Sequence, residues 1–257
     1  MKRAQHFAGL TALATLLIAV PAFAQMAQPA GDAAMVVWVD PLPGHGSAFE
    51  EGVRQHMSNM MEAGETQTWV SFEVIAGDRT GQYVVGTFNH AWADFDQPPP
   101  NPAMAGESMA DNIVPHVEDF EIQYIWRDTN LGTWAPDEPI APMYQLIQFD
   151  VKPGHMPGFE TFVSKIKNAF ETMGEGSYSV FRPVLGGQGG QVTISVPRQG
   201  FAEFAQDDPQ FFENMMRELY GVAETRLLME TMDAAIASER SYLLVFRPDM
   251  SMNLPDS

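Results

Sequence analysis

The chain alternates between short apolar, β-prone runs and helical faces, and this alternation occurs twice. Met143 to Val151 is apolar and mostly β-prone, the turn Pro153-Gly154-His155 interrupts it, and a helical face follows. The same order of strand, turn-rich loop, helix and strand occurs from Ala34 to Val74, at a nearly constant offset. The pattern therefore predicts an internal duplication, which says more about fold than about chemistry.

Each copy is expected to contain four strands and two helical regions. In the first copy, a helix with apolar side chains at helical spacing follows the first strand, and a Gly-rich hairpin separates the second and third strands. A second helical region, interrupted by prolines, leads to a closing strand. The expected elements are a strand at 35–40, a helix at 49–61, strands at 69–75 and 82–88, a helical region at 91–114 and a strand at 121–127.

The second copy matches the first at many single positions. The offset is 110 residues in the first helix, 109 at the hairpin and 120 at the last strand, which predicts a longer second helical region in the second copy. Gly221 is expected to break that region into two helices. The matched residues include Asp40 with Asp150, Phe49-Glu50 with Phe159-Glu160, Phe72 with Phe181, Trp92 with Phe201, and Ile125-Trp126-Arg127 with Val245-Phe246-Arg247.

A strand–helix–strand–strand–helix–strand order predicts an α+β fold. The right-handed crossover rule gives each copy a four-stranded antiparallel sheet with both helices on one face. Two such units can bury their bare faces against each other, which gives an eight-stranded barrel with the helices outside. We expect the units at residues 34–127 and 143–248, a Pro-, Asp- and Gly-rich linker at 128–142 and a tail at 249–257.

These features resemble the tandem dimeric α+β barrel superfamily, whose units are ferredoxin-like. The resemblance lies in the doubled βαββαβ order, the aromatic residues Trp92 and Phe201 that begin the second helical regions, and the junction Val151-Lys152-Pro153-Gly154-His155. The first copy departs from this junction because Leu42 replaces the lysine. Members include cofactor-free monooxygenases, haem enzymes, dehalogenating and isomerising enzymes and proteins of unknown function, so the resemblance implies a fold rather than an activity.

The N-terminus and the composition restrict location and partners. A basic start, an apolar run from Leu10 to Val20 and Ala22-Phe23-Ala24 predict a signal peptide at residues 1–24, followed by a disordered segment at 25–33. We therefore expect a bacterial periplasmic or secreted protein, with no membrane span after cleavage. Cysteine is absent and the net charge is −19; without Lys2 and Arg3, 12 basic and 33 acidic residues leave −21. Such a charge disfavours nucleic acid as a partner. The sequence predicts no oligomeric state.

Alternation along the strands predicts which side chains face the barrel interior. Val37, Val39, Ile147 and Phe149 are uniformly apolar and are assigned to the helix-covered face. The opposite face then carries a mixed set, which predicts either a satisfied polar network or a ligand pocket. The ligand-binding candidates on this face are Trp38, Asp40, Gln148 and Asp150.

Two further pairs of candidates come from equivalent positions in the copies. Glu73 and Arg182 occupy the second strands and are expected either to meet across the pseudo-two-fold axis or, by the favoured interpretation, to be solvated. His45 and His155 stand at the helix entrances, where an imidazole can act as an acid, a base or a ligand, or simply be exposed. We predict no metal site and no cofactor, because no ligand spacing accompanies these residues.

The sequence leaves several functions open. The leading hypothesis is a barrel that binds a small ligand between its two repeats. The alternatives are a cofactor-independent monooxygenase, in which Trp38, Gln148, Asp40 and Asp150 would orient an aromatic or quinol substrate, and a haem-binding member with His90 or His116 as axial ligand. A structural protein that interacts through its acidic surface is a third possibility.

Overall fold

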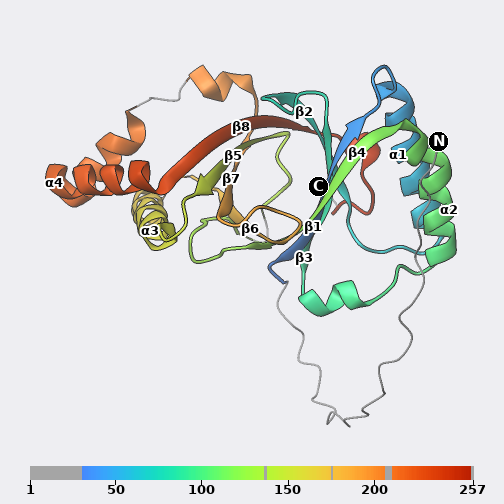
Figure 1. Ribbon diagram of the computed structural model, residues 1–257, viewed down its shortest axis with the longest axis horizontal. Helices are drawn as coiled ribbons and strands as arrows, with labels where there is room; N and C mark the ends of the chain where they lie inside the picture. The colour runs from blue at the N-terminus through green and yellow to red at the C-terminus, as the bar shows by residue number, and fades with distance from the viewer. Residues whose placement is uncertain (1–30, 136–137, 175, 206–209, 256–257) are drawn as a thin grey trace, which may run out of the picture.

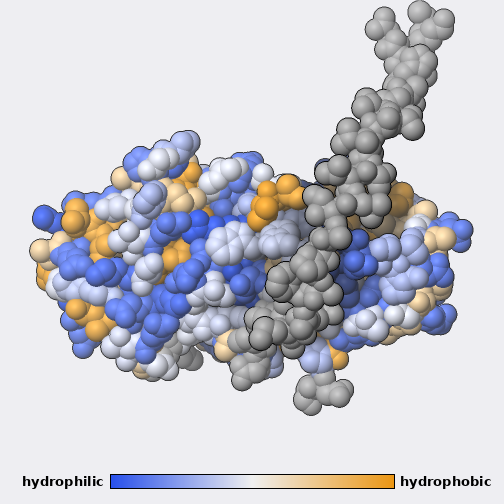
Figure 2. Space-filling model, turned by 90° about the horizontal axis from the view of Figure 1, so that it is seen from below, coloured by the Kyte–Doolittle hydropathy of each residue, from blue (hydrophilic) through white to orange (hydrophobic). Residues whose placement is uncertain are grey.

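The computed structural model describes residues 31–135, 138–174, 176–205 and 210–255. The expected signal peptide at 1–24 and most of the segment at 25–33 lie outside these residues. In the described part of the chain, every helix is too short or too polar to cross a lipid bilayer. Figure 2 shows hydrophobic side chains in small groups among hydrophilic ones on the face that it presents.

Both halves have the predicted order of elements. The first half contains β1 (Ala33–Pro41), α1 (Gly46–Glu62), β2 (Val70–Ala76), β3 (Tyr83–His90), α2 (Pro102–Asn112) and β4 (Val117–Arg127). The second half contains β5 (Met143–Val151), α3 (Met156–Met173), β6 (Ser179–Leu185), β7 (Gln191–Arg198), α4 (Phe211–Ala235) and β8 (Ile236–Phe246). As predicted, α4 is broken at Gly221, whose φ of 79° is a conformation that L side chains rarely adopt.

The strands form one closed antiparallel barrel in the order β1-β3-β2-β8-β5-β7-β6-β4. Each half contributes four consecutive strands, and the pairs β2–β8 and β4–β6 join the halves. Helices α1 and α2 lie outside the first half and α3 and α4 outside the second, on opposite sides of the barrel (Figure 1). The α+β barrel of two ferredoxin-like units is therefore confirmed, and hydrogen bonds between the sheet edges close it.

The junctions between strands and helices follow from the repeated Pro-Gly-His turn. Gly44 and Gly154 have φ values of 80° and 83°, which glycine adopts without the strain that a Cβ would cause. The helix that follows then buries one face against its own sheet. Phe49 and Phe159, at equivalent positions in the two helices, are both fully buried. The alternation was assigned correctly: the core under α1 contains Val37 and Val39, and the core of the second half contains Ile147 and Phe149.

The match at the last strand was wrong by one residue. Ala34 pairs with Ile125, and Tyr144, which lies 110 residues after Ala34, pairs with Leu244 rather than Val245. The structural offset is therefore 119, not 120. Because successive side chains of a strand point to opposite faces, a shift of one residue matches each side chain of β4 with a side chain of β8 that lies on the opposite face of the sheet. Arg127 corresponds to Phe246 in the structure, and not to Arg247.

The expected linker and the C-terminal tail continue the repeat. The backbone N–H of Asp128 donates to Val180, as that of Arg247 donates to Ser71. Further along, the N–H of Thr133 donates to Tyr178, and that of Met252 donates to Trp69. In both comparisons the two donor residues are 119 positions apart in the sequence and the two acceptor residues are 109 positions apart. The two segments therefore extend the two halves in the same way, and both run along the same end of the barrel.

Candidate functional site

The barrel encloses a cavity of about 570 Å³. Aromatic and aliphatic side chains form most of its wall, and a smaller number of polar groups interrupt them. The lining residues that the structure describes are Val36, Trp38, Thr68, Val70, Phe72, Val84, Phe88, Asn89, Gln123, Ile125, Arg127, Trp134, Glu138, Ile140, Tyr144, Leu146, Gln148, Ser179, Phe181, Pro183, Gln191, Thr193, Ser195, Leu244, Asn253 and Pro255.

Among the sequence-predicted candidates, the structure brings Trp38 and Gln148 to this lumen. The Gln148 carboxamide oxygen lies 3.4 Å from the hydroxyl of Tyr242, whose ring centre is 5.7 Å from that of Trp38. Both candidates stand near the middle of their strands, where alternation decides which face a side chain occupies. The lumen is thus mixed in polarity, as the sequence predicts.

The lumen has two chemically different ends. Because neighbouring strands are antiparallel throughout, β1, β2, β5 and β6 run one way and the other four run the opposite way. Asp40 and Asp150 therefore lie at one end, and Arg127 lies at the other, which we call the Arg127 end. Linker residues Trp134, Glu138 and Ile140 and tail residues Asn253 and Pro255 line the cavity there.

Asp40 and Asp150 do not line the cavity. Asp40 accepts a hydrogen bond of 3.2 Å from the Gln82 carboxamide. Asp150 accepts hydrogen bonds from Ser238 and, at 3.0 Å, from Arg240. Each carboxylate stands near the end of its strand; the partner of Asp40 directly precedes β3, and the partners of Asp150 belong to β8. The prediction that Asp40 and Asp150 line the lumen is therefore wrong, because the alternation does not continue to these strand ends.

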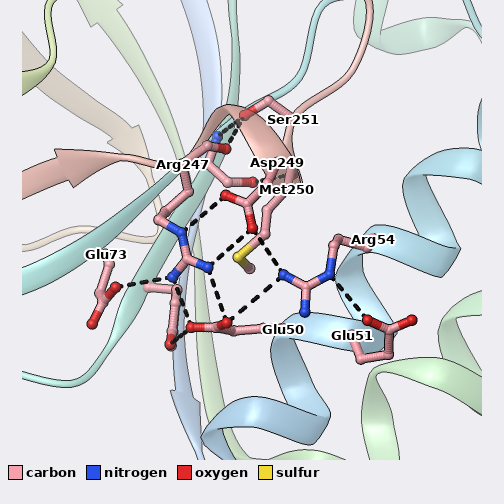
Figure 3. A network of polar contacts seen from close by, with 10 residues as sticks. Glu50, Glu51, Arg54, Glu73, Arg247, Asp249, Met250 and Ser251 are labelled. Atoms are coloured by element: carbon pink, nitrogen blue, oxygen red, sulfur yellow. Dashed lines mark hydrogen bonds and ion pairs between the residues drawn. The ribbon is translucent and has the colours of Figure 1, made fainter.

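Glu73 and Arg182 neither meet across the pseudo-two-fold axis nor stand free in solvent. Glu73 accepts a hydrogen bond of 3.0 Å from Arg247, which also binds Glu50 at 2.7 Å. Figure 3 shows the Arg247 guanidinium between these carboxylates and that of Asp249. At the equivalent place in the second half, Arg182 binds Asp128 at 3.0 Å and Glu160 at 2.9 Å.

These two ion-pair networks occupy related sites, with the charges exchanged at two positions and a glutamate, Glu50 or Glu160, at the third in both. Glu73 corresponds to Arg182, and Arg247 corresponds to Asp128 by the structural offset of 119 residues. Both networks lie on the helix side of the barrel wall, since Phe72 and Phe181, which precede Glu73 and Arg182, face the lumen. Their geometry indicates that they join the halves and take no part in contacting a ligand in the lumen.

The histidines also lie away from the lumen. His45 and His155 are exposed and directly precede α1 and α3. The Nδ1 atoms of His45 and His116 lie 3.2 Å apart on the surface. His90 is buried, but its Nε2 lies 2.5 Å from the Thr87 hydroxyl, and burial lowers its pKa.

The residues present do not fit haem in the lumen, because neither histidine proposed as an axial ligand reaches it. The described residues also contain no group of three or more histidine, aspartate or glutamate side chains that could hold a metal ion. The prediction of no cofactor stays a prediction.

Arg127 is the main lumen residue that the sequence analysis missed. It is 7% exposed, and its guanidinium carbon lies 3.6 Å from the centre of the Trp134 ring. Nη1 donates to Asn89 at 2.8 Å, while Nε is buried without a hydrogen-bond partner among the described residues. Burial lowers the pKa of Arg127 to about 10, so the side chain is still cationic at neutral pH.

Asn89 and Tyr144 complete the Arg127 end. Asn89 has a φ of 65°, an uncommon conformation for a residue other than glycine, and its carboxamide oxygen reaches Arg127. The Tyr144 hydroxyl accepts the backbone N–H of Ala141 at 3.0 Å, and burial raises its pKa. Continuing the alternation from Gln123 through Ile125 would have placed Arg127 in the lumen. No periodic signal identifies Asn89, whose positive φ interrupts β3 near its end, or Trp134, which lies in the linker.

Neither protein-family profiles nor curated protein sequences give a match to the chain. Solved structures do resemble it. A protein from Lactobacillus acidophilus NCFM, provisionally described as a monooxygenase, has a TM-score of 0.51 at 11% identity, covering 85% of this chain and 94% of that one. One from Fusobacterium nucleatum with the same description has 0.53 at 15%, covering 84% and 93%.

Two further structures extend this comparison. An anthrone oxidase-like protein has a TM-score of 0.50 at 12% identity, covering 88% of this chain and 95% of that one. A variant of chlorite dismutase from Candidatus Nitrospira defluvii in complex with cyanide has 0.50 at 9%, covering 86% and 92%. At these identities the likeness shows the fold alone. The chain therefore has the dimeric α+β barrel fold, with a lumen whose occupant has to be argued from its own residues.

Proposed function

We propose that this protein binds a small, largely apolar and aromatic ligand inside its barrel. The observation that carries the proposal is the cavity of about 570 Å³, which falls within the roughly 300–1,000 Å³ typical of small-molecule sites. A wall of apolar side chains with a few polar groups is also typical of such sites. The closed barrel and the two segments at the Arg127 end support this role, because they hold the wall in place before a ligand arrives.

The aromatic side chains of the lumen favour a planar ligand. Six aromatic residues line the cavity, and aromatic rings attract one another in offset or edge-to-face contacts of about 0.5–1.5 kcal/mol beyond the area that they bury. The polar groups in the middle of the lumen can fix the orientation of such a ligand through one or two hydrogen bonds. The aromatic lining residues are Trp38, Phe72, Phe88, Trp134, Tyr144 and Phe181.

A second candidate is a cofactor-independent monooxygenase. It is supported by the placement of Trp38 and Gln148 in a lumen of mixed polarity and by the overall likeness to structures described as monooxygenases or anthrone oxidase-like. In this reaction a bound phenol and O₂ would give a quinone and water; each product would receive one atom of the O₂, and the substrate would supply all of the electrons. Oxygen uptake with a phenolic substrate, stopped by blocking the lumen, would show it; binding without uptake would leave binding as the function.

The proposed setting is the bacterial periplasm or the extracellular space. The apolar run and the small residues near the N-terminus support export, and the charge of −19 supports a protein that avoids nucleic acid.

The test uses the neutral fluorescent probe N-phenyl-1-naphthylamine with the purified protein. Ser179 and Ser195 pair across β6 and β7 and both line the cavity, so the double variant Ser179→Phe/Ser195→Phe fills it from the wall. We expect the wild-type protein to bind the probe and the double variant to bind it at least about tenfold more weakly, about 1.4 kcal/mol. The control is Val184→Phe, which adds a ring at a position 52% exposed and should bind normally. Equal binding by all three proteins would refute a lumen site.

A further inference from the structure

We infer that the lumen selects a ligand carrying an acidic group, a planar aromatic carboxylate or its equivalent, and that Arg127 binds this group. The inference rests on the proposed function, since it specifies the ligand of the same cavity. It concerns the Arg127 end, where the linker, the tail and the ends of β3 and β4 come together.

The first observation is a break in the symmetry of the lumen. At the β2–β8 junction, Phe72 pairs with Phe246, and their ring centres lie 5.6 Å apart. At the symmetry-related β4–β6 junction, Phe181 pairs with Arg127, whose guanidinium carbon lies 5.3 Å from the Phe181 ring centre. The position equivalent to Arg127 in the second half is therefore occupied by a phenylalanine, Phe246. An arginine in the same place adds a buried charge, which stacks on the Trp134 ring.

The second observation is that no carboxylate contacts this charge directly, although Asp32 and Glu138 lie near enough to raise the pKa of Arg127 against the effect of burial. No ion pair within 4.0 Å joins Arg127 to an acidic side chain in the described part of the chain, and its buried Nε has no acceptor there. Burying a guanidinium without a directly bound carboxylate costs free energy, and here burial outweighs the charges of Asp32 and Glu138, since the pKa of Arg127 is lowered on balance. Of the cavity-lining residues that the structure describes, Arg127 is the only cation.

Glu138, the acidic side chain in the same wall, is already bound elsewhere. One of its carboxylate oxygens accepts the backbone N–H of Ala135 at 3.0 Å, and the other accepts the Ser177 hydroxyl at 2.5 Å. Glu138 therefore fixes the linker over the end of the barrel and leaves the guanidinium available. An incoming carboxylate would give Arg127 the partner that the chain does not supply.

The third observation is that the guanidinium is held in a fixed orientation. Trp134 lies against one face at 3.6 Å, Asn89 accepts from Nη1 at 2.8 Å, and Nε is buried, so these contacts fix the side chain where it lines the cavity. A guanidinium edge binds a carboxylate through two parallel N–H···O bonds. The Tyr144 hydroxyl, whose proton has no acceptor among the described residues, lines the same end and offers a further donor.

The experiment compares 2-naphthoate with 2-naphthamide, which have the same ring and nearly the same size but differ in charge. Isothermal titration at neutral pH is carried out with the wild-type protein, Arg127→Met, Arg127→Lys and Arg79→Met. The last variant removes a cation that lies 4.6 Å from the Trp38 ring and does not line the cavity, so it is the matched control.

We expect the wild-type protein and Arg79→Met to bind naphthoate about 10- to 100-fold more tightly than naphthamide, which is the gain in affinity that hydrogen bonds between charged groups usually give. Arg127→Met should lose this preference while still binding naphthamide, and Arg127→Lys should restore part of it. Equal affinities of the wild-type protein for both compounds would overturn the inference and leave lumen binding intact. Binding of neither compound would count against the proposed function itself. The wild-type comparison needs no variant, so it decides the matter even if Arg127→Met fails to fold.

Discussion

The Arg247 network offers a direct test of how the two halves are joined. Arg247 follows the last strand of the second half and binds Glu50 at 2.7 and 2.9 Å and Glu73 at 3.0 Å in the first half. The change Arg247→Leu keeps the aliphatic bulk and removes the cation that Glu50, Glu73 and Asp249 share, while Arg54 still binds Asp249 at 2.8 Å and Glu50 at 3.7 Å. Removing one partner of a fully buried ion pair costs about 3–5 kcal/mol. Since Arg247 is 19% exposed and the carboxylates are more so, we expect a loss of about 2–3 kcal/mol.

The assay is urea unfolding at neutral pH, followed by tryptophan fluorescence, with the midpoint and slope fitted for each protein. The matched control is Arg226→Leu, which removes an exposed helical pair in which Arg226 and Glu230 lie 3.8 Å apart. That variant should change the free energy of unfolding by less than about 0.5 kcal/mol. If Arg247→Leu lies within the same margin of the wild-type value, the network does not join the halves and the reasoning is refuted.

The same network predicts how stability depends on acid. Hydrogen bonds from Arg247 lower the pKa of Glu50 and of Asp249 below the ordinary carboxyl range. A carboxyl whose folded pKa is lowered stabilises the protein above its unfolded pKa, and this stabilisation is lost as pH falls through the folded pKa. Wild-type stability should therefore decline below about pH 4, and Arg247→Leu should decline less over the same range.

Two further predictions concern the helix-covered cores. Phe159→Ala removes a fully buried ring and should cost about 3–5 kcal/mol in urea unfolding, while Phe201→Ala, at a position 65% exposed, should cost less than about 0.5 kcal/mol; similar costs would contradict the core assignment. His56, whose Nδ1 lies 3.0 Å from the Ser108 hydroxyl, has its pKa lowered by burial. As pH falls, His56 is therefore protonated in the unfolded chain before it is protonated in the folded protein, and the free energy of unfolding should fall below about pH 6.5. His56→Gln should weaken that dependence between pH 7.5 and 5.5, and an unchanged pH profile would argue against it.

The fold could be predicted from the sequence because its signals are local and doubled. The Pro-Gly-His turns, the apolar helix faces and the hairpins occur twice, and one βαββαβ order leaves a sheet face bare that a second copy can cover. Alternation then placed Trp38 and Gln148 in the lumen, since both stand well inside their strands. The closing hydrogen bonds between sheet edges needed no separate signal once two such units were present.

The candidate site could be predicted only where the alternation was unambiguous. Aligning Arg127 with Arg247 looked natural in the sequence, yet the strand register differs by one residue and puts the two side chains on opposite faces of the wall. Asp40 failed for a related reason, because it stands where its strand leaves the barrel. Trp134 could not be assigned, since a linker without periodicity gives no indication of which surface it covers.

The central claim is that the barrel lumen holds an acidic aromatic ligand at its Arg127 end, and a crystal structure of the protein grown with 2-naphthoate tests it most directly. The account predicts a naphthalene ring among the aromatic residues of the lumen, with its carboxylate within hydrogen-bonding distance of Arg127. A ligand bound outside the barrel, or a lumen closed by its own side chains in the presence of saturating naphthoate, would contradict it.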